Sequence, residues 1–172
     1  MIRRSEETDS SDIAKPRDFV QGLVGQSCTR VRTRLGWTIL LDFGPLRTLR
    51  SSSRPRPNPS LIGAWAVVAW GADVWLHLPS GETVHGDLDE KEPVNDAGQR
   101  LVGLRVTSVD VLSARLDLEL SFEDGSRLRL IPNDDADETG DEQWSVLTAA
   151  GAALKVTRPG EWFAIDPPKP AE

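Results

Sequence analysis

The strongest constraint on the fold is an internal duplication. Residues 23–31 and 101–109 align at an offset of 78, and five of their nine positions are identical. Other matches keep nearly the same spacing: Phe43 with Phe122, Trp65 with Trp144, and residues 71–79 with 151–159. A solenoid needs three or more stacked repeats. Two copies instead predict two related half-units packed around a pseudo-twofold axis.

Each half begins with a short predicted helix, at residues 16–23 and 95–102. Pro16 suits a first helical turn, and Asn95 or Asp96 can cap the second helix. Both helices are followed by a glycine that accepts a positive φ at a helix end: Gly25 and Gly103.

Strands are expected after both helices, because apolar residues recur at every second position. The clearest run has apolar Leu116, Leu118, Leu120 and Phe122 between polar residues, and is followed by the hairpin turn signal Asp124 and Gly125. In the first half, the same parity places Trp37, Ile39, Leu41 and Phe43 inward, and Thr38 and Asp42 outward. The spacing of such runs predicts roughly ten to twelve short strands.

These patterns predict a mainly β (α+β) fold. Two pseudo-repeated β-rich halves are expected to form one sandwich or open barrel, with a short helix before each half. The expected boundaries are a disordered tail at 1–15, half-repeats at 16–92 and 93–166, and a tail at 167–172. The aligned Trp65 and Trp144 are expected to be core pillars of the two halves.

Composition excludes several classes of protein. The chain has 172 residues and one cysteine, so it forms no internal disulfide. Cys28 aligns with Val106, which predicts a small buried side chain. The longest apolar run, at 61–70, is far shorter than the roughly 20 residues of a membrane-spanning helix, and the first residues lack the apolar core of a secretory signal. We therefore expect a cytoplasmic protein with no membrane contact.

Charge is distributed unevenly along the chain. Residues 1–65 contain eleven basic and six acidic side chains, whereas residues 66–172 contain nine and twenty-one. Such asymmetry indicates either a surface for a charged partner or two halves that neutralise each other within one molecule.

No catalytic motif is visible. The sequence lacks a nucleophile elbow, a phosphate-binding loop, a dinucleotide fingerprint and a zinc-protease motif. His77 and His85 do not have zinc-ligand spacing. The acidic segment 134–142 begins like an EF-hand loop, but Val146 stands where the bidentate Glu is required, which leaves a weak cation site as the alternative. We predict no catalytic residue, no metal and no cofactor.

Two sets of side chains are candidates for binding a macromolecule. An exposed Trp can anchor a protein interface, and acidic side chains favour a basic partner. This partner-binding set is Trp70, Trp75, His77, Asp134, Asp135, Asp137, Glu138 and Asp141. Arginine rows can instead contact nucleic-acid phosphates. This alternative set is Arg30, Arg32, Arg34, Arg47, Arg50, Arg54 and Arg56.

The second half also carries a longer pattern of strand and turn residues. The pattern comprises Leu116, Leu118, Leu120, Phe122, Asp124, Gly125, Leu128, Leu130, Pro132, Glu142, Trp144, Val146, Pro159, Gly160 and Trp162. Through this pattern, residues 100–166 resemble a family of uncharacterised small actinobacterial proteins. Such proteins resemble the immunity proteins of bacterial toxin systems, which are small, acidic and without catalytic motifs. The resemblance implies a protein partner and transfers no site residue.

The leading expectation is a non-enzymatic protein-binding module, immunity-like or regulatory, that engages a basic partner through its acidic half. One alternative is nucleic-acid binding through the arginine set. The other is a small-ligand or enzyme pocket between the halves. The oligomeric state stays open.

Overall fold

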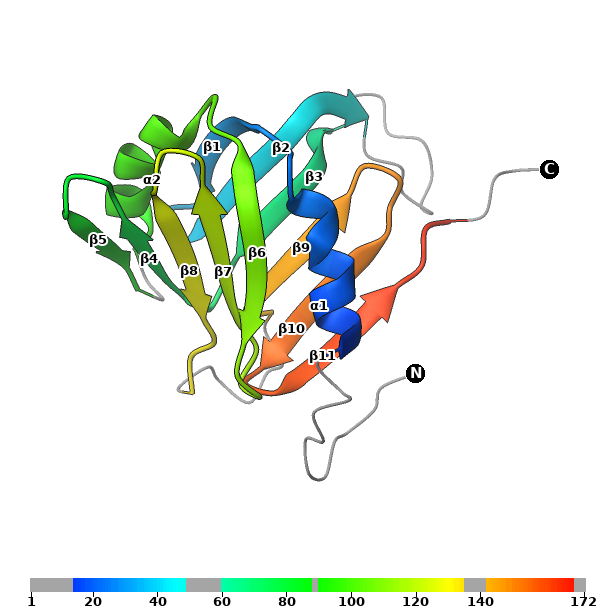
Figure 1. The fold of residues 1–172 in the computed structure, drawn as a ribbon. Helices are drawn as coiled ribbons and strands as arrows, with labels where there is room; N and C mark the ends of the chain where they lie inside the picture. The colour runs from blue at the N-terminus through cyan, green and yellow to red at the C-terminus, as the bar shows by residue number, and fades with distance from the viewer. Residues whose placement is uncertain (1–13, 49–59, 88–89, 135–141, 169–172) are drawn as a thin grey trace.

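The computed structural model describes residues 14–48, 60–87, 90–134 and 142–168. Eleven strands in these ranges form two antiparallel sheets, in the orders β1-β2-β3-β9-β10-β11 and β5-β4-β8-β7-β6. The sheets pack face to face and do not close into a barrel, so the fold is a mainly β sandwich (Figure 1). The strands are β1 (Cys28–Arg34), β2 (Thr38–Thr48), β3 (Leu61–Ala69), β4 (Asp73–His77), β5 (Thr83–Gly86), β6 (Val106–Leu112), β7 (Asp117–Phe122), β8 (Arg127–Ile131), β9 (Trp144–Thr148), β10 (Ala153–Arg158) and β11 (Glu161–Ile165).

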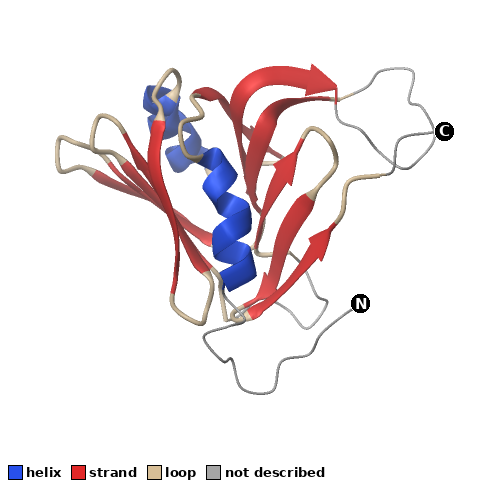
Figure 2. Cartoon of the chain, turned by 45° about the vertical axis from the view of Figure 1, so that its right-hand side comes forward, coloured by secondary structure: helices blue, strands red, loops and turns tan. Residues whose placement is uncertain are grey.

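A short helix precedes each half. The helices are α1 (Ala14–Val20) and α2 (Glu92–Gly98), and each continues into a 3-10 turn, η1 (Gln21–Leu23) or η2 (Gln99–Leu101). Figure 2 shows both helices beside the space between the two sheets. Their apolar side chains, such as Val20 and Val94, are fully buried in the core.

The duplication is visible as pairs of equivalent backbone contacts. Gly25 donates its N–H to the carbonyl of Val106, and Gly103 donates to that of Cys28, both at 2.8 Å. Both donors have a positive φ, which glycine adopts without strain. Ser27 and Arg105, equivalent to each other, form an isolated bridge between the halves. These contacts confirm that the segments 23–31 and 101–109 are related by a pseudo-twofold axis. The sheet order, however, makes β3 equivalent to β8 and β4 to β9, so the expected alignments of Trp65 with Trp144 and of residues 71–79 with 151–159 are wrong.

Equivalent glutamines of the two halves cover two edge strands, β6 and β1. The side chain of Gln21 donates to the carbonyl of Val109 on β6 at 2.8 Å, and Gln99 donates to that of Val31 on β1 at 2.9 Å. Arg17 adds a bond to the carbonyl of Val111 at 3.1 Å. These side chains satisfy acceptors that an edge strand otherwise presents to solvent.

The sheets do not coincide with the sequence halves. Strand β4 of the first half pairs with β8 of the second, and β5 extends that sheet beyond β4. Strand β9 of the second half pairs with β3 of the first, and β10 and β11 extend that sheet beyond β9. Each half therefore contributes strands to both sheets. Trp65 and Trp144 consequently lie on neighbouring strands of one sheet, where Trp144 is fully buried and Trp65 packs partly buried against the core.

Several local expectations were wrong. Asn95 and Asp96 lie inside α2, because the helix begins at Glu92 after the N-cap residue Lys91. Ala14 and Lys15 belong to α1 and not to a tail. The remaining predicted tail residues, 1–13 and 169–172, lie outside the described residues.

The predicted inward and outward sides of β2 also need correction. Trp37 is 47% exposed, because the strand begins only at Thr38 and Trp37 still belongs to the hairpin connection. Thr38 and Asp42 lie on the outer face of the sheet, as predicted, but both are buried there. Side chains on the outer face of this sheet therefore bury one another. The alternation of residues along the strand does not predict this burial.

Candidate functional site

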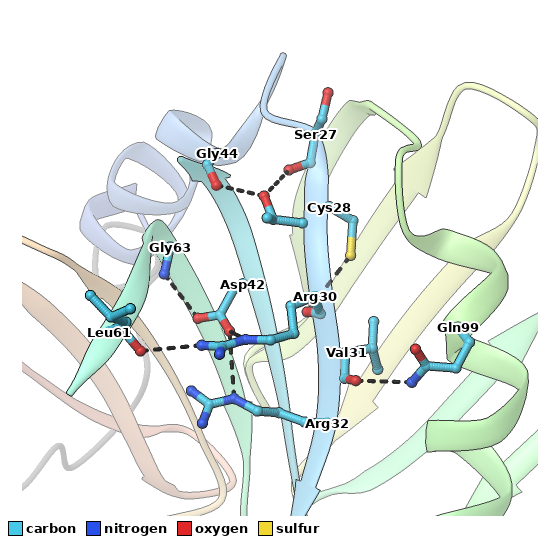
Figure 3. Close-up of polar contacts among 11 residues, drawn as sticks. Ser27, Cys28, Arg30, Val31, Arg32, Asp42, Gly44, Leu61, Gly63 and Gln99 are labelled. Atoms are coloured by element: carbon cyan, nitrogen blue, oxygen red, sulfur yellow. Dashed lines mark hydrogen bonds and ion pairs between the residues drawn. The ribbon is translucent and has the colours of Figure 1, made fainter. Parts of the chain in front are cut away.

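The outer face of the six-stranded sheet is organised around a buried carboxylate. Asp42 of β2 has no exposed surface and accepts a hydrogen bond from the Nε of Arg30 at 2.7 Å (Figure 3). The Nε of Arg32 lies 3.5 Å from the same oxygen. Its other oxygen accepts the backbone N–H of Gly63 at 2.9 Å, opposite a register irregularity between Phe43 and Leu46. Asp42 therefore ties β1, β2 and β3 together.

Half of the described members of the arginine set are bound within the protein itself. Arg30 uses a second nitrogen on the carbonyl of Leu61 at 3.2 Å, while Arg34 and Arg47 are exposed. Two members of the row are thus bound by their own sheet. The remaining members, Arg50, Arg54 and Arg56, lie outside the described residues.

The rest of this outer face is apolar. Ile62, Ala66 and Ala149 are buried there in a small cluster with the partly buried Leu147. This cluster is separate from the main core between the sheets. Lys155 and Glu142 form an ion pair close by.

The outer face of the five-stranded sheet carries a row of aromatic and ionisable side chains. The strand register places one residue of each strand in a single transverse row: His85, Trp75, Arg129, Glu119 and Asp110. No described helix or strand lies over this face (Figure 2). One end of the row therefore carries Trp75 with His85 and Arg129. The other end carries the two acids, Glu119 and Asp110.

The two acids of the row have no bonded partner among the residues that the structure describes. Glu119 faces Asp110 directly across β6 and β7. Arg129 is its neighbour on β8, but the Nη2 of Arg129 binds Asp117 at 2.8 Å. Within the described residues, neither Asp110 nor Glu119 has a hydrogen bond or an ion pair.

The aromatic end of the row is ordered by stacking. The rings of Trp75 and His85 stack with centroids 4.0 Å apart. His85 lies 4.0 Å from a carboxylate oxygen of Asp73. On the next row of the same face, His77 contacts the hydroxyl of Thr83 at 3.0 Å. Trp75 and His77, both predicted for partner binding, thus share one face of β4.

The other predicted partner residues do not join them. Trp70 follows the last residue of β3, in the other sheet, and is 37% exposed. Asp134 is exposed and pairs with Arg115 at 3.0 Å, where the carboxylate raises the pKa of the guanidinium. The remaining loop acids, Asp135, Asp137, Glu138 and Asp141, lie outside the described residues.

The groups that nucleophilic or metal chemistry would need are not assembled in the described part of the chain. Cys28 is 1% exposed, as predicted, and burial raises the pKa of its thiol to about 12. It therefore stays protonated and unreactive at neutral pH. The described ranges contain no group of three His, Cys, Asp or Glu side chains able to hold a metal ion.

Sequence reasoning identified Trp75 and His77 but missed Glu119 and Asp110 as a pair. Strand alternation does predict that Glu119 points outward. Its position opposite Asp110, and the position of Trp75 in the same row, depend on which strands pair, and pairing between distant segments is not encoded locally.

Comparison with known proteins adds no relative. No family model, curated protein or solved structure matches the chain. Among the described residues, no helix has the length and apolar character needed to cross a membrane.

Proposed function

We propose that this chain is a non-enzymatic protein-binding module, and that the outer face of β5-β4-β8-β7-β6 engages a basic partner. The observation that carries the proposal is the pair Glu119 and Asp110, two carboxylates that face each other and have no hydrogen bond or ion pair within the described residues. An immunity-like or regulatory role, as the resemblance of the second half implies, would use such a face.

The energetics of this pair favour a bound state over the free protein. Like charges directly opposite each other on a sheet are destabilising. A Lys or Arg placed between Glu119 and Asp110 converts that repulsion into two attractions. The free protein thus bears a cost that binding removes, and the complementary charge also speeds and orients the encounter.

Trp75 supplies the apolar anchor that charge alone lacks. It is only half-buried, and its stacking on His85 fixes the ring before any partner arrives. Tryptophan is enriched among the residues that dominate binding energy at interfaces. A ring held in place loses little conformational freedom on binding.

The five strands set the size of the face. At about 4.8 Å between neighbouring strands, the row from His85 to Asp110 spans roughly 19 Å. A single partner helix or hairpin covers that width. The aromatic and acidic ends of the row can thus be engaged together.

The test is capture of partners from the native host with the wild-type chain and with Glu119→Gln/Asp110→Asn and Trp75→Ala. The matched control is Asp96→Asn, an exposed acid on α2. We expect one basic protein to be retained by wild type and control, and lost with both face variants. Its affinity for the purified chain should fall as salt rises. A partner held equally by the face variants would overturn the proposal.

A further inference from the structure

The six-stranded sheet ends in a strand whose outer edge is unlike the other three edges. Strand β11 is the last strand, and no described helix or strand pairs with its outer side (Figure 1). The edges of β6 and β1 are bonded by Gln21 and Gln99. Strand β5 has four residues, and its end at Gly86 packs closely against Val94 of α2. Of the described edges, β11 alone has neither device.

This strand also departs from the duplication. The three-stranded units β1-β2-β3 and β6-β7-β8 are extended by three strands in one sheet and by two in the other. Strand β11 is thus the addition without a counterpart. Its sequence, EWFAI, has four apolar residues in succession. Trp162 packs against the core, whereas Phe163 is half-buried and Ile165 is 41% exposed.

We infer that β11 pairs antiparallel with β11 of a second copy, joining two six-stranded sheets into one. A twofold register centred on Phe163 places Trp162 opposite Ala164 of the other copy, a large residue against a small one. It also stacks two Phe163 rings across the axis on the outer face. Cross-strand aromatic pairs stabilise antiparallel sheets.

The alternation of side chains along β11 selects the register. In the register centred on Phe163, Glu161 faces the apolar Ile165 of the second copy, while Arg158 of its own β10 lies beside it. A register shifted by one position would set Glu161 opposite Asp166, whose side chain belongs to the other face of the strand, and directly opposite residues of an antiparallel pair share a face. A shift by two positions leaves only three of the five residues of β11 paired. The strand is therefore self-complementary in one antiparallel register.

The contact is small, so the dimer is weak. One five-residue strand pair buries less than the roughly 1,600 Å² of a standard stable interface. A net charge of −7 on each copy also opposes association at low salt. We expect a monomer–dimer equilibrium in the range of roughly 10 to 500 µM, tighter at about 150 mM salt than at low salt.

The experiment is sedimentation equilibrium of the full chain over that range. Phe163→Lys and Phe163→Glu place like charges on the axis, so each variant alone should dimerise at least about tenfold more weakly. An equimolar mixture of the two should recover association, which a merely misfolded variant cannot do. Leu61→Lys, the same change at a 50% exposed apolar residue elsewhere, is the matched control and should dimerise as wild type does. A wild type that stays monomeric throughout, or a dimer unaffected by both Phe163 variants, overturns the inference.

Discussion

The two outer faces of the sandwich treat their charges in opposite ways. On the six-stranded sheet, Asp42 is fully buried and bound by two arginines and a backbone N–H. On the five-stranded sheet, Asp117 is paired with Arg129, but Asp110 and Glu119 face each other with no hydrogen bond or ion pair within the described residues. Paired, buried charge holds strands together, whereas unpaired, exposed charge remains available for a partner.

The comparison also explains the uneven charge of the sequence. The basic strand β1 and the acidic strands β6 and β7 belong to different sheets, whose outer faces point in opposite directions (Figure 2). Arg30 and Arg32 are neutralised by Asp42 of their own sheet and not by the acids of the second half.

The largest expected effect comes from removing the buried carboxylate. Asp42→Ala leaves Arg30 and the N–H of Gly63 without their acceptor, so we expect the free energy of unfolding to fall by about 3 kcal/mol. Asp117→Ala removes a carboxylate that is itself only 9% exposed but whose partner, Arg129, is 37% exposed and keeps access to water, so the loss should be smaller, about 1 kcal/mol. Urea unfolding of both variants measures the difference. Equal losses would contradict the distinction between the two faces.

The next effect tests the backbone beside Asp42. A Cβ at Gly63 would lie 2.5 Å from the backbone nitrogen of Phe43 and 2.6 Å from the carbonyl oxygen of Trp65. Backbone atoms in a paired sheet cannot move away, so Gly63→Ala should cost about 2 kcal/mol. Thermal unfolding measures the loss. A neutral Gly63→Ala would mean that the irregularity opposite Gly63 absorbs the methyl group.

Some features of the fold can be predicted from the sequence, whereas the surroundings of Asp42 and Gly63 cannot. Helices, hairpin turns and the buried Cys28 are local or repeated features, and alternation or alignment predicts them. The burial of Asp42 depends on Gly63, twenty-one residues away, and on a strand irregularity. The pairing of strands between the two halves could not be predicted either, because the sequence of a short apolar strand does not specify which strand it pairs with.

A smaller effect compares two equivalent positions of the repeat. Burial raises the pKa of Cys28 from 9.0 to about 12, so the folded state favours the neutral thiol. The corresponding stability is complete below pH 9.0 and is lost as the pH rises from 9.0 toward about 12. Cys28→Val copies the aligned Val106, should cost less than about 1 kcal/mol at pH 7, and should flatten the alkaline decline. Unfolding measured from pH 7 to 11 tests this, and an unchanged decline in the variant would assign it to other groups.

The smallest effect has the opposite sign. Asp110→Asn removes the repulsion with Glu119, so the free protein should gain about 0.5 kcal/mol of stability at low salt. The gain should shrink as salt screens the pair. Unfolding at low and high ionic strength measures it. If Asp110→Asn destabilises the protein, the pair is not repulsive and the main support for the proposed face is lost.

The exchange of strands between halves has a consequence for the origin of the chain. A single repeat does not complete either sheet alone, since β4 pairs with β8 and β9 pairs with β3 of the opposite repeat. Two separate copies exchanging those strands would have formed an isologous, domain-swapped homodimer. Joining two such copies in one chain makes the exchange intramolecular, so a concentration-dependent assembly is replaced by the closure of one loop. Fragments 1–90 and 91–172, expressed separately, should therefore be unfolded alone and assemble into the sandwich when mixed.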